Sequence, residues 1–125
     1  MPTRPPIHQA HAAHQEYERS RGNFRQQGYS KRWDRLSLQH RKQHPLCVGC
    51  LAVGHTVLAH CADHIVPHKG DPALMWATTN IQSACKWHHD TIKQQLELMY
   101  LRKEIDACEL RLDSATAIKL TLARR

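Results

Sequence analysis

Two pairs of cysteine and histidine residues offer metal-binding chemistry. Cys47 and Cys50 are separated by two residues, and Cys85 and His88 repeat this spacing further along the chain. A two-residue gap lets one tight turn present two ligands, and a structural zinc ion takes four thiolate or imidazole ligands in a tetrahedron. Closing the long loop between the pairs with a metal would add folding energy to a small chain. The sequence therefore predicts a structural zinc site of the Cys₃His type.

The same cysteines have two alternative interpretations. A disulfide is disfavoured by the mixed second pair and by the intracellular setting that the sequence indicates. A redox C-x-x-C motif would be accompanied by a βαβ pattern, which the sequence lacks. The two remaining cysteines, Cys61 and Cys108, are expected to be buried as small apolar residues.

A second group of polar residues lies inside the loop that the metal would close. Asp63 and His64 lie near the end of an apolar, β-branched stretch, Asn80 follows a turn-rich segment, and His89 directly follows the last zinc ligand. Successive strand residues point to opposite faces, so Asp63 can bind a metal while His64 faces another part of the site. Successive helix residues diverge by about 100°, so His89 can point away from the zinc that His88 would bind.

The surrounding pattern supplies the elements that would hold these residues. Ser30 can cap a first helix, and Pro and Gly separate the later segments. The pattern predicts a helix over 31–42, a strand over 56–66, a loop at 67–72, a short second strand or turn at 77–82, a helix from Cys85 or Lys86 to about Ile105, an extended segment at 110–112 and a last helix from Asp113 or Ser114 to about Leu122.

Charge is unevenly distributed along the 125 residues, whose net charge is +7. Residues 1–46 carry 9 Lys/Arg and 3 Asp/Glu, residues 47–90 carry 2 and 3, and residues 91–125 carry 7 and 5. A basic N-terminal segment is typical of a protein that contacts a polyanion, with nucleic acid the first candidate. Residues 1–28 are also polar enough to be a flexible basic arm, and the two interpretations are compatible.

Composition excludes several classes of protein. The chain has no collagen-like period, no low-complexity bulk and no long heptad array. The apolar stretch 46–62 is too short and too interrupted for a membrane span, and residues 1–6 lack the apolar stretch of a signal peptide. We expect a soluble, cytoplasmic monomer of a bacterial or phage-infected host cell, with no membrane partner.

From about Gly28 to Lys93 the chain resembles the HNH endonucleases, especially the small phage-type enzymes with a treble-clef-like zinc site. Order, spacing and flanking residues agree together. The matching stretches are Gly28-Tyr29 with Trp33, His44 to Cys47, Asp63 to Leu74 with Trp76, Asn80 to Cys85, and His88 to Asp90.

The resemblance implies an α+β fold. Its centre is a ββα-metal (HNH, treble-clef-like) finger with structural zinc, flanked by an N-terminal helix and a C-terminal helical extension. The expected organisation is a flexible basic arm over 1–28, an HNH nuclease domain with the zinc knuckle over 29–106, and an extension over 107–125.

The resemblance also implies metal-dependent hydrolysis of DNA phosphodiester bonds. By it, His64 matches the general base, and Asp63 and His89 match the ligands of a catalytic divalent ion, Mg²⁺ or Mn²⁺, with Ni²⁺ and Zn²⁺ as alternatives. Asn80 matches the residue that braces the loop between the strands and holds a backbone carbonyl that orients the base. The structural zinc ligands are Cys47, Cys50, Cys85 and His88, the last at a position that is commonly Cys in these relatives.

Four further residues are candidate DNA contacts: His68, Lys69, Lys86 and Lys93. Lys93 stands where some relatives supply another metal-binding His, so the ion would have two protein ligands and Lys93 would contact phosphate. Such relatives often work beside phage packaging proteins, which joins these to DNA as expected partners. The alternatives are a non-catalytic, zinc-stabilised DNA-binding module and an adaptor that presents its C-terminal helix to a protein.

Overall fold

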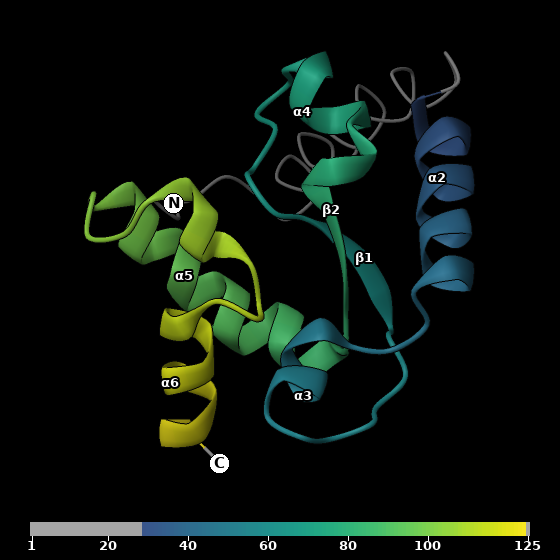
Figure 1. Ribbon diagram of the computed structural model, residues 1–125. Helices are drawn as coiled ribbons and strands as arrows, with labels where there is room; N and C mark the ends of the chain where they lie inside the picture. The colour runs from purple at the N-terminus through teal and green to yellow at the C-terminus, as the bar shows by residue number, and fades with distance from the viewer. Residues whose placement is uncertain (1–28, 125) are drawn as a thin grey trace, which may run out of the picture. The chain divides into compact units, whose positions relative to one another are not determined.

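A computed structural model describes residues 29–124 of the chain (Figure 1). The expected flexible arm, residues 1–28, lies outside the described residues. Helix α2 (Tyr29–Gln43) confirms the prediction of a helix over 31–42. It crosses the boundary between the two units of the chain, residues 1–35 and 36–125. All later elements belong to the second unit.

The second unit is a small α+β arrangement of one hairpin and several short helices. Strands β1 (Cys61–His64) and β2 (Ile81–Ala84) pair antiparallel, with Asp63 opposite Gln82. Between residues 29 and 124, no helix combines the length and the apolar content that a bilayer span requires. The helical elements are α3 (Val48–Ala52), α4 (Pro72–Trp76), the 3₁₀ turn η1 (Thr78–Asn80), the π-helical turn η2 (His88–Ile92), α5 (Lys93–Leu101), the 3₁₀ turn η3 (Ala107–Leu110) and α6 (Ala115–Arg124).

Strand β1 is shorter than the predicted strand over 56–66. Residues before Cys61 are bonded to the segment around the first cysteine pair instead. The amide of Cys47 donates to the carbonyl of Val57 at 2.8 Å, and the amide of Ala59 donates to the carbonyl of Pro45 at 2.8 Å. These β-branched and apolar residues therefore line the knuckle and do not extend the hairpin.

The connection between the strands contains a short helix that the sequence did not predict. The loop over 67–72 is present, but α4 begins at its last residue. The Asp71 carboxylate accepts a hydrogen bond from the amide of Ala73 at 2.9 Å, and Pro72 occupies the first turn. An Asp N-cap followed by Pro is a standard helix start. The predicted second strand is shifted, because η1 takes residues 78–80 and β2 begins at Ile81.

The long C-terminal helix ends earlier than predicted. Helix α5 stops at Leu101, and Lys103 adopts a φ of 62°, in the left-handed region. The amide of Glu104 donates back to the carbonyl of Met99 at 2.9 Å. This backward bonding is a helix C-cap, so the apolar residues as far as Ile105 do not continue the helix.

The predicted start of the last helix is confirmed. The hydroxyl of Ser114 accepts a hydrogen bond from the amide of Ala117 at 3.1 Å, and α6 begins at Ala115. Ser114, one of the two candidates, is thus the capping residue. Leu110, predicted as extended, instead ends η3.

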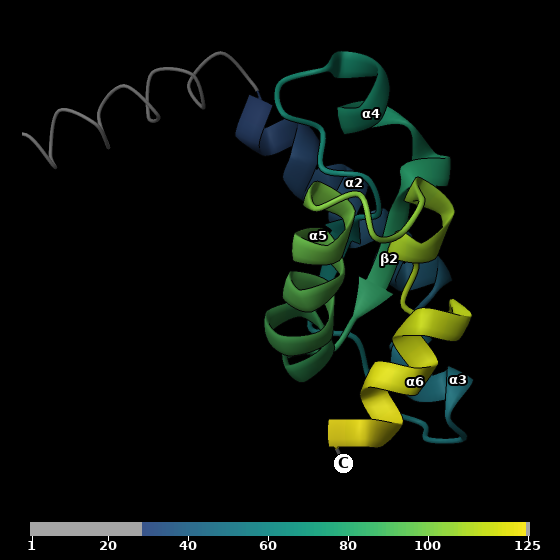
Figure 2. The same ribbon diagram turned by 90° about the vertical axis from the view of Figure 1, so that its left-hand side faces the viewer.

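One apolar cluster joins the hairpin to the helices that follow it. Figures 1 and 2 show α5 and α6 side by side. Ala84 of the hairpin and Ile65, which follows it, lie in the same cluster as Leu96 of α5. Residues 107–124, for which the sequence offered no motif, contribute several of the buried side chains. The buried members are Ile65, Ala84, Ile92, Leu96, Leu110, Leu112 and Ala117.

The two leftover cysteines lie outside this buried cluster. Cys61 is half-buried at the start of β1 and packs at the edge of the cluster. Cys108 is exposed, so the expectation that it is buried is wrong. It lies in the one-turn η3, where only Leu110 is buried.

Candidate functional site

The two predicted halves of the zinc site meet in the structure. One ligand atom from each of Cys47, Cys50, Cys85 and His88 lies within 4.8 Å of all the others. Nδ1 of His88 is 3.6 Å from Sγ of Cys47 and 3.4 Å from Sγ of both Cys50 and Cys85. The last two sulfurs are 3.8 Å apart. Ligand bonds of about 2.0–2.3 Å in a tetrahedron put neighbouring ligand atoms about 3.5–3.8 Å apart. The group is therefore suited to structural Zn²⁺, as predicted.

Tight turns present each half of this cluster. Cys47 directly precedes α3, and Cys50 lies within that short helix. Cys85 follows β2, and the amide of His88 lies 3.4 Å from the Cys85 sulfur, to which it donates. Gly49 faces the ring of His88, and a Cβ at this position would lie 2.3 Å from its Cδ2 atom. Only glycine allows α3 to approach the histidine this closely.

Burial of the cluster shapes its proton chemistry. Burial, followed by the neighbouring sulfurs of Cys47 and Cys85, raises the pKa of Cys50 to about 12. Zinc binds thiolate, so a bound ion would have to displace the thiol protons. Metal binding at such a site releases protons, and its affinity falls as the pH is lowered.

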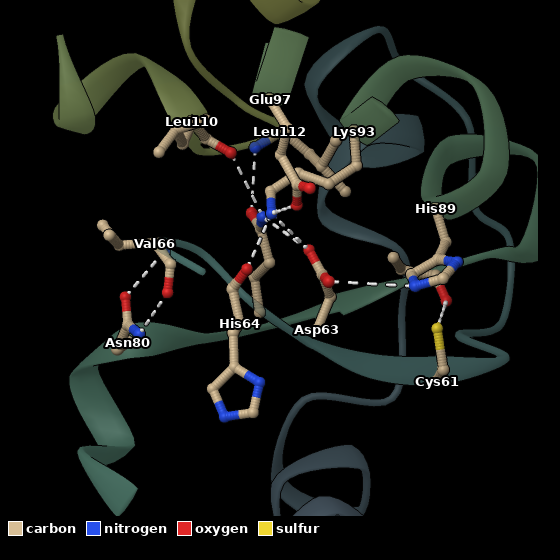
Figure 3. Close-up of polar contacts among 12 residues, drawn as sticks. Cys61, Asp63, His64, Val66, Asn80, His89, Lys93, Glu97, Leu110 and Leu112 are labelled. Atoms are coloured by element: carbon tan, nitrogen blue, oxygen red, sulfur yellow. Dashed lines mark hydrogen bonds and ion pairs between the residues drawn. The ribbon is translucent and has the colours of Figure 1, made fainter. Parts of the chain in front are cut away.

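Asp63 and His89 face each other between β1 and the first turn of η2 (Figure 3). Nε2 of His89 lies 3.8 Å from Oδ1 of Asp63. The other ring nitrogen of His89, Nδ1, is 3.0 Å from a carboxylate oxygen of Asp90. In a neutral ring, Nδ1–H donates to Asp90 and the lone pair of Nε2 faces Asp63. A carboxylate oxygen and an imidazole lone pair at this separation can share one divalent cation.

Lys93 forms an ion pair with the second carboxylate oxygen of Asp63. Its Nζ lies 3.0 Å from Oδ2 of Asp63 and 2.7 Å from Oε2 of Glu97. It also donates to the backbone carbonyl of His64 at 2.7 Å. The side chain is 1% exposed. The structure therefore does not present Lys93 as the phosphate contact expected from the sequence, because its ammonium is buried among three protein oxygens.

His64 lies at the end of β1, with its ring directed away from the Asp63 carboxylate (Figure 3). Nε2 of the ring is 3.0 Å from the backbone carbonyl of Met75. A carbonyl only accepts, so Nε2 carries the hydrogen and the proton acceptor of the neutral ring is Nδ1.

Asn80 braces the loop that supplies this carbonyl. Its Oδ1 accepts from the amide of Val66 at 2.9 Å, and its Nδ2 donates to the carbonyl of Val66 at 3.0 Å. Nδ2 also donates to the carbonyl of Leu74 at 2.9 Å. Asn80 thus holds both ends of the 66–74 loop. The carbonyl that orients His64 belongs to the next residue, Met75, and is held indirectly.

The remaining candidate DNA contacts surround this region. His68 stacks edge-on against His64, with ring centroids 4.7 Å apart. Burial, and then the neighbouring His64, lower the pKa of His68. Lys69 is exposed with a φ of 47°. Lys86 is exposed too, and its ammonium lies 2.7 Å from the Asp90 carboxylate.

Gln82 is a residue of the site that the sequence did not single out. It is buried on β2, and its Nε2 lies 3.5 Å from Oδ2 of Asp63. The same amide donates to the carbonyl of Leu110 and accepts from the amide of Leu112. Gln82 thereby connects the Asp63 carboxylate to the C-terminal segment. Its one sequence signal was a polar residue at the end of the segment predicted as a second strand or turn.

Comparisons of the chain with protein-family models, with curated proteins and with solved structures found no match. The geometry establishes a small domain with a two-stranded hairpin, helices and a Cys₃His group suited to zinc.

Proposed function

We propose that the protein is a metal-dependent endonuclease of the HNH type that hydrolyses phosphodiester bonds of DNA. In this proposal the hairpin and the η2–α5 helix form the ββα-metal finger, and the Cys₃His group holds its structural zinc. One observation carries the proposal. Asp63 of β1 and His89 of η2 bring a carboxylate oxygen and a ring nitrogen to 3.8 Å, and the next residue of β1, His64, holds a separately oriented imidazole.

His64 would act as the general base. The neutral imidazole of a histidine can accept a proton from water. The bond from Nε2–H to Met75 holds the ring in one tautomer and leaves Nδ1 as the accepting atom. Asn80 would act as a positioning residue, because it bonds the carbonyl of Leu74, the residue before Met75.

Asp63 and His89 would hold the catalytic divalent ion. One carboxylate and one imidazole, with further positions left to water and phosphate, suit Mg²⁺, Mn²⁺ or a later transition metal. Such an ion stabilises the charge that develops on the phosphate and on the leaving oxygen. The proposed partners are therefore DNA and, by the sequence resemblance, phage packaging proteins.

Lys93 would position the metal-binding carboxylate. Its ammonium holds Oδ2 of Asp63 and leaves Oδ1 facing His89. Glu97 completes the pair and keeps the buried cation hydrogen-bonded. In this arrangement Asp63 offers one oxygen to the ion.

A second candidate function is a zinc-stabilised DNA-binding module without catalysis. One observation favours it: Lys93 already compensates the charge of Asp63, so the carboxylate is stable without a divalent ion.

Cleavage of supercoiled plasmid separates the two functions. The chain, its His64→Ala variant and a His55→Ala control would be incubated with Mg²⁺, Mn²⁺, Ni²⁺ or EDTA. His55 is exposed and lies outside the site, so its variant should cut like the wild type. The nuclease proposal requires metal-dependent cutting that His64→Ala loses while its circular dichroism is unchanged. Salt-sensitive DNA binding without cutting by any of the three proteins supports the DNA-binding module.

A further inference from the structure

The two ring nitrogens of His88 have different surroundings. The ring is fully buried, and its Nδ1 faces the three cysteine sulfurs. On the opposite side, Nε2 lies 3.2 Å from Oγ1 of Thr121, a buried residue of α6. A histidine can bind a metal through either nitrogen, and the partner of the other nitrogen selects between them.

The hydroxyl of Thr121 can only accept from His88. Thr121 Oγ1 donates its single hydrogen to the carbonyl of Ala117, one turn earlier in α6, at 2.8 Å. With that hydrogen committed, the oxygen offers lone pairs to its second neighbour. Nε2 of His88 therefore carries the ring hydrogen, and the lone pair of the neutral ring lies on Nδ1, where the sulfurs converge.

The place of Thr121 in the core gives this contact its rigidity. Ala117 is fully buried in the apolar cluster that also contains Leu110 and Leu112, so α6 packs on the core as well as on His88. On its other side the His88 ring meets Gly49. The ring is thus held between α3 and α6, two elements far apart in the sequence.

From these contacts we infer that Thr121 is a positioning residue of the zinc centre. It holds His88 as an Nδ1 ligand and makes α6 part of the metal site. Docking of α6 and binding of zinc are then coupled, and each strengthens the other by the same free energy. The inference concerns the Cys₃His group and is independent of the proposed nuclease activity.

Zinc affinity of matched threonine variants tests this inference. The full chain, Thr121→Val, Thr121→Ser and Thr116→Val would compete for zinc with a chromophoric chelator at fixed pH. Thr121→Val keeps the shape of the side chain but loses the acceptor, and we expect its zinc affinity to fall by about 10-fold or more. Thr121→Ser keeps the hydroxyl and should retain the affinity. Thr116→Val makes the same substitution on the same helix, where the lost hydroxyl donates to a carboxylate oxygen of Glu109 at 3.1 Å, and it should also retain the affinity.

Equal zinc affinity in the wild type and in a folded Thr121→Val variant would overturn the inference. A loss of the same size in Thr116→Val would do so too, because it would assign the effect to helix stability. If Thr121→Val does not fold, long-range ¹H–¹⁵N spectra of the zinc-loaded wild type decide the question. They should show the ring proton of His88 on Nε2, and a proton on Nδ1 would contradict the assignment.

Discussion

Asp63 has two carboxylate oxygens with different partners, and this asymmetry governs what the site can bind. Oδ2 is held by Lys93, and Oδ1 faces Nε2 of His89. Lys93 compensates the carboxylate charge and anchors it to the backbone of His64. A buried cation with two carboxylates and a carbonyl leaves no ammonium hydrogen unpaired.

Replacing Lys93 tests this arrangement. Lys93→Met keeps most of the aliphatic length but leaves the Asp63 and Glu97 carboxylates without their shared cation. Removing one partner of a buried ion pair costs about 3–5 kcal/mol, and the partial exposure of Glu97 argues for the lower end. Urea denaturation of the zinc-loaded protein measures this change.

The matched control for that substitution is Lys86→Met. Lys86 makes an equivalent i,i+4 ion pair with Asp90, but at the surface. Exposed pairs contribute little, so the urea midpoint of the control should stay at the wild-type value. Equal midpoints for both variants would show that the buried network does not stabilise the fold.

At the scale of elements, the close approach of α3 to the His88 ring depends on one glycine. A methyl group on Gly49 would overlap the ring, which Thr121 holds from the other side. The hydrogen bond to Thr121 opposes displacement of the imidazole by an added methyl group. Elements α3, η2 and α6 therefore meet at the side chain of His88.

Gly49→Ala is expected to displace His88 and weaken zinc binding. Overpacking of a buried site costs about 1–3 kcal/mol, and here the displaced group is a ligand. The zinc affinity measured by chelator competition and the free energy of unfolding measured with urea should therefore both fall.

Gly54→Ala supplies the control for Gly49→Ala. Gly54 has a φ of 85° with nothing within 4 Å of an added Cβ, so alanine there strains the backbone by about 1–2 kcal/mol. Its zinc affinity should be unchanged. Two results would contradict a role for the close approach of Gly49 to His88: a lower zinc affinity in Gly54→Ala, or an unchanged zinc affinity in Gly49→Ala.

At the scale of the whole molecule, the metal cluster and the apolar core join remote parts of the chain. The cluster connects α3 to the start of η2, and the core connects the hairpin to α5 and α6. The contact between His88 and Thr121, 33 positions apart in the sequence, links the metal cluster to α6. Loss of the metal should therefore destabilise parts of the fold beyond the Cys47–Cys50 turn.

Removal of zinc is expected to destabilise the entire second unit. A strong chelator, or the Cys47→Ser substitution, should lower the thermal midpoint and increase amide hydrogen exchange in the knuckle and in α6. Structural zinc sites contribute about 10 kcal/mol or more of binding free energy near pH 7. An unchanged midpoint after verified zinc removal would show that the cluster is not structural.

Short-range features of this protein could be predicted from its sequence. The ligand pairs Cys47/Cys50 and Cys85/His88, helix α2 and the Ser114 cap each depend on residues within a turn or two of one another. Their spacing alone specifies the local geometry. The series Asp63, His64, Asn80 and His89 was also readable, although its catalytic role stays a prediction.

Only the tertiary structure decided which polar side chains are buried and what they contact. The sequence suggested that Lys93 is a surface cation. In the structure it is buried and bonds the carbonyl of His64, which lies 29 positions earlier in the chain. The same holds for Gln82 and Thr121, whose partners come from distant segments. Burial of a polar group depends on every element that covers it, and the sequence around the group does not contain that information. The identity of the ligands was local information, whereas the residues that orient them depended on how the chain packs.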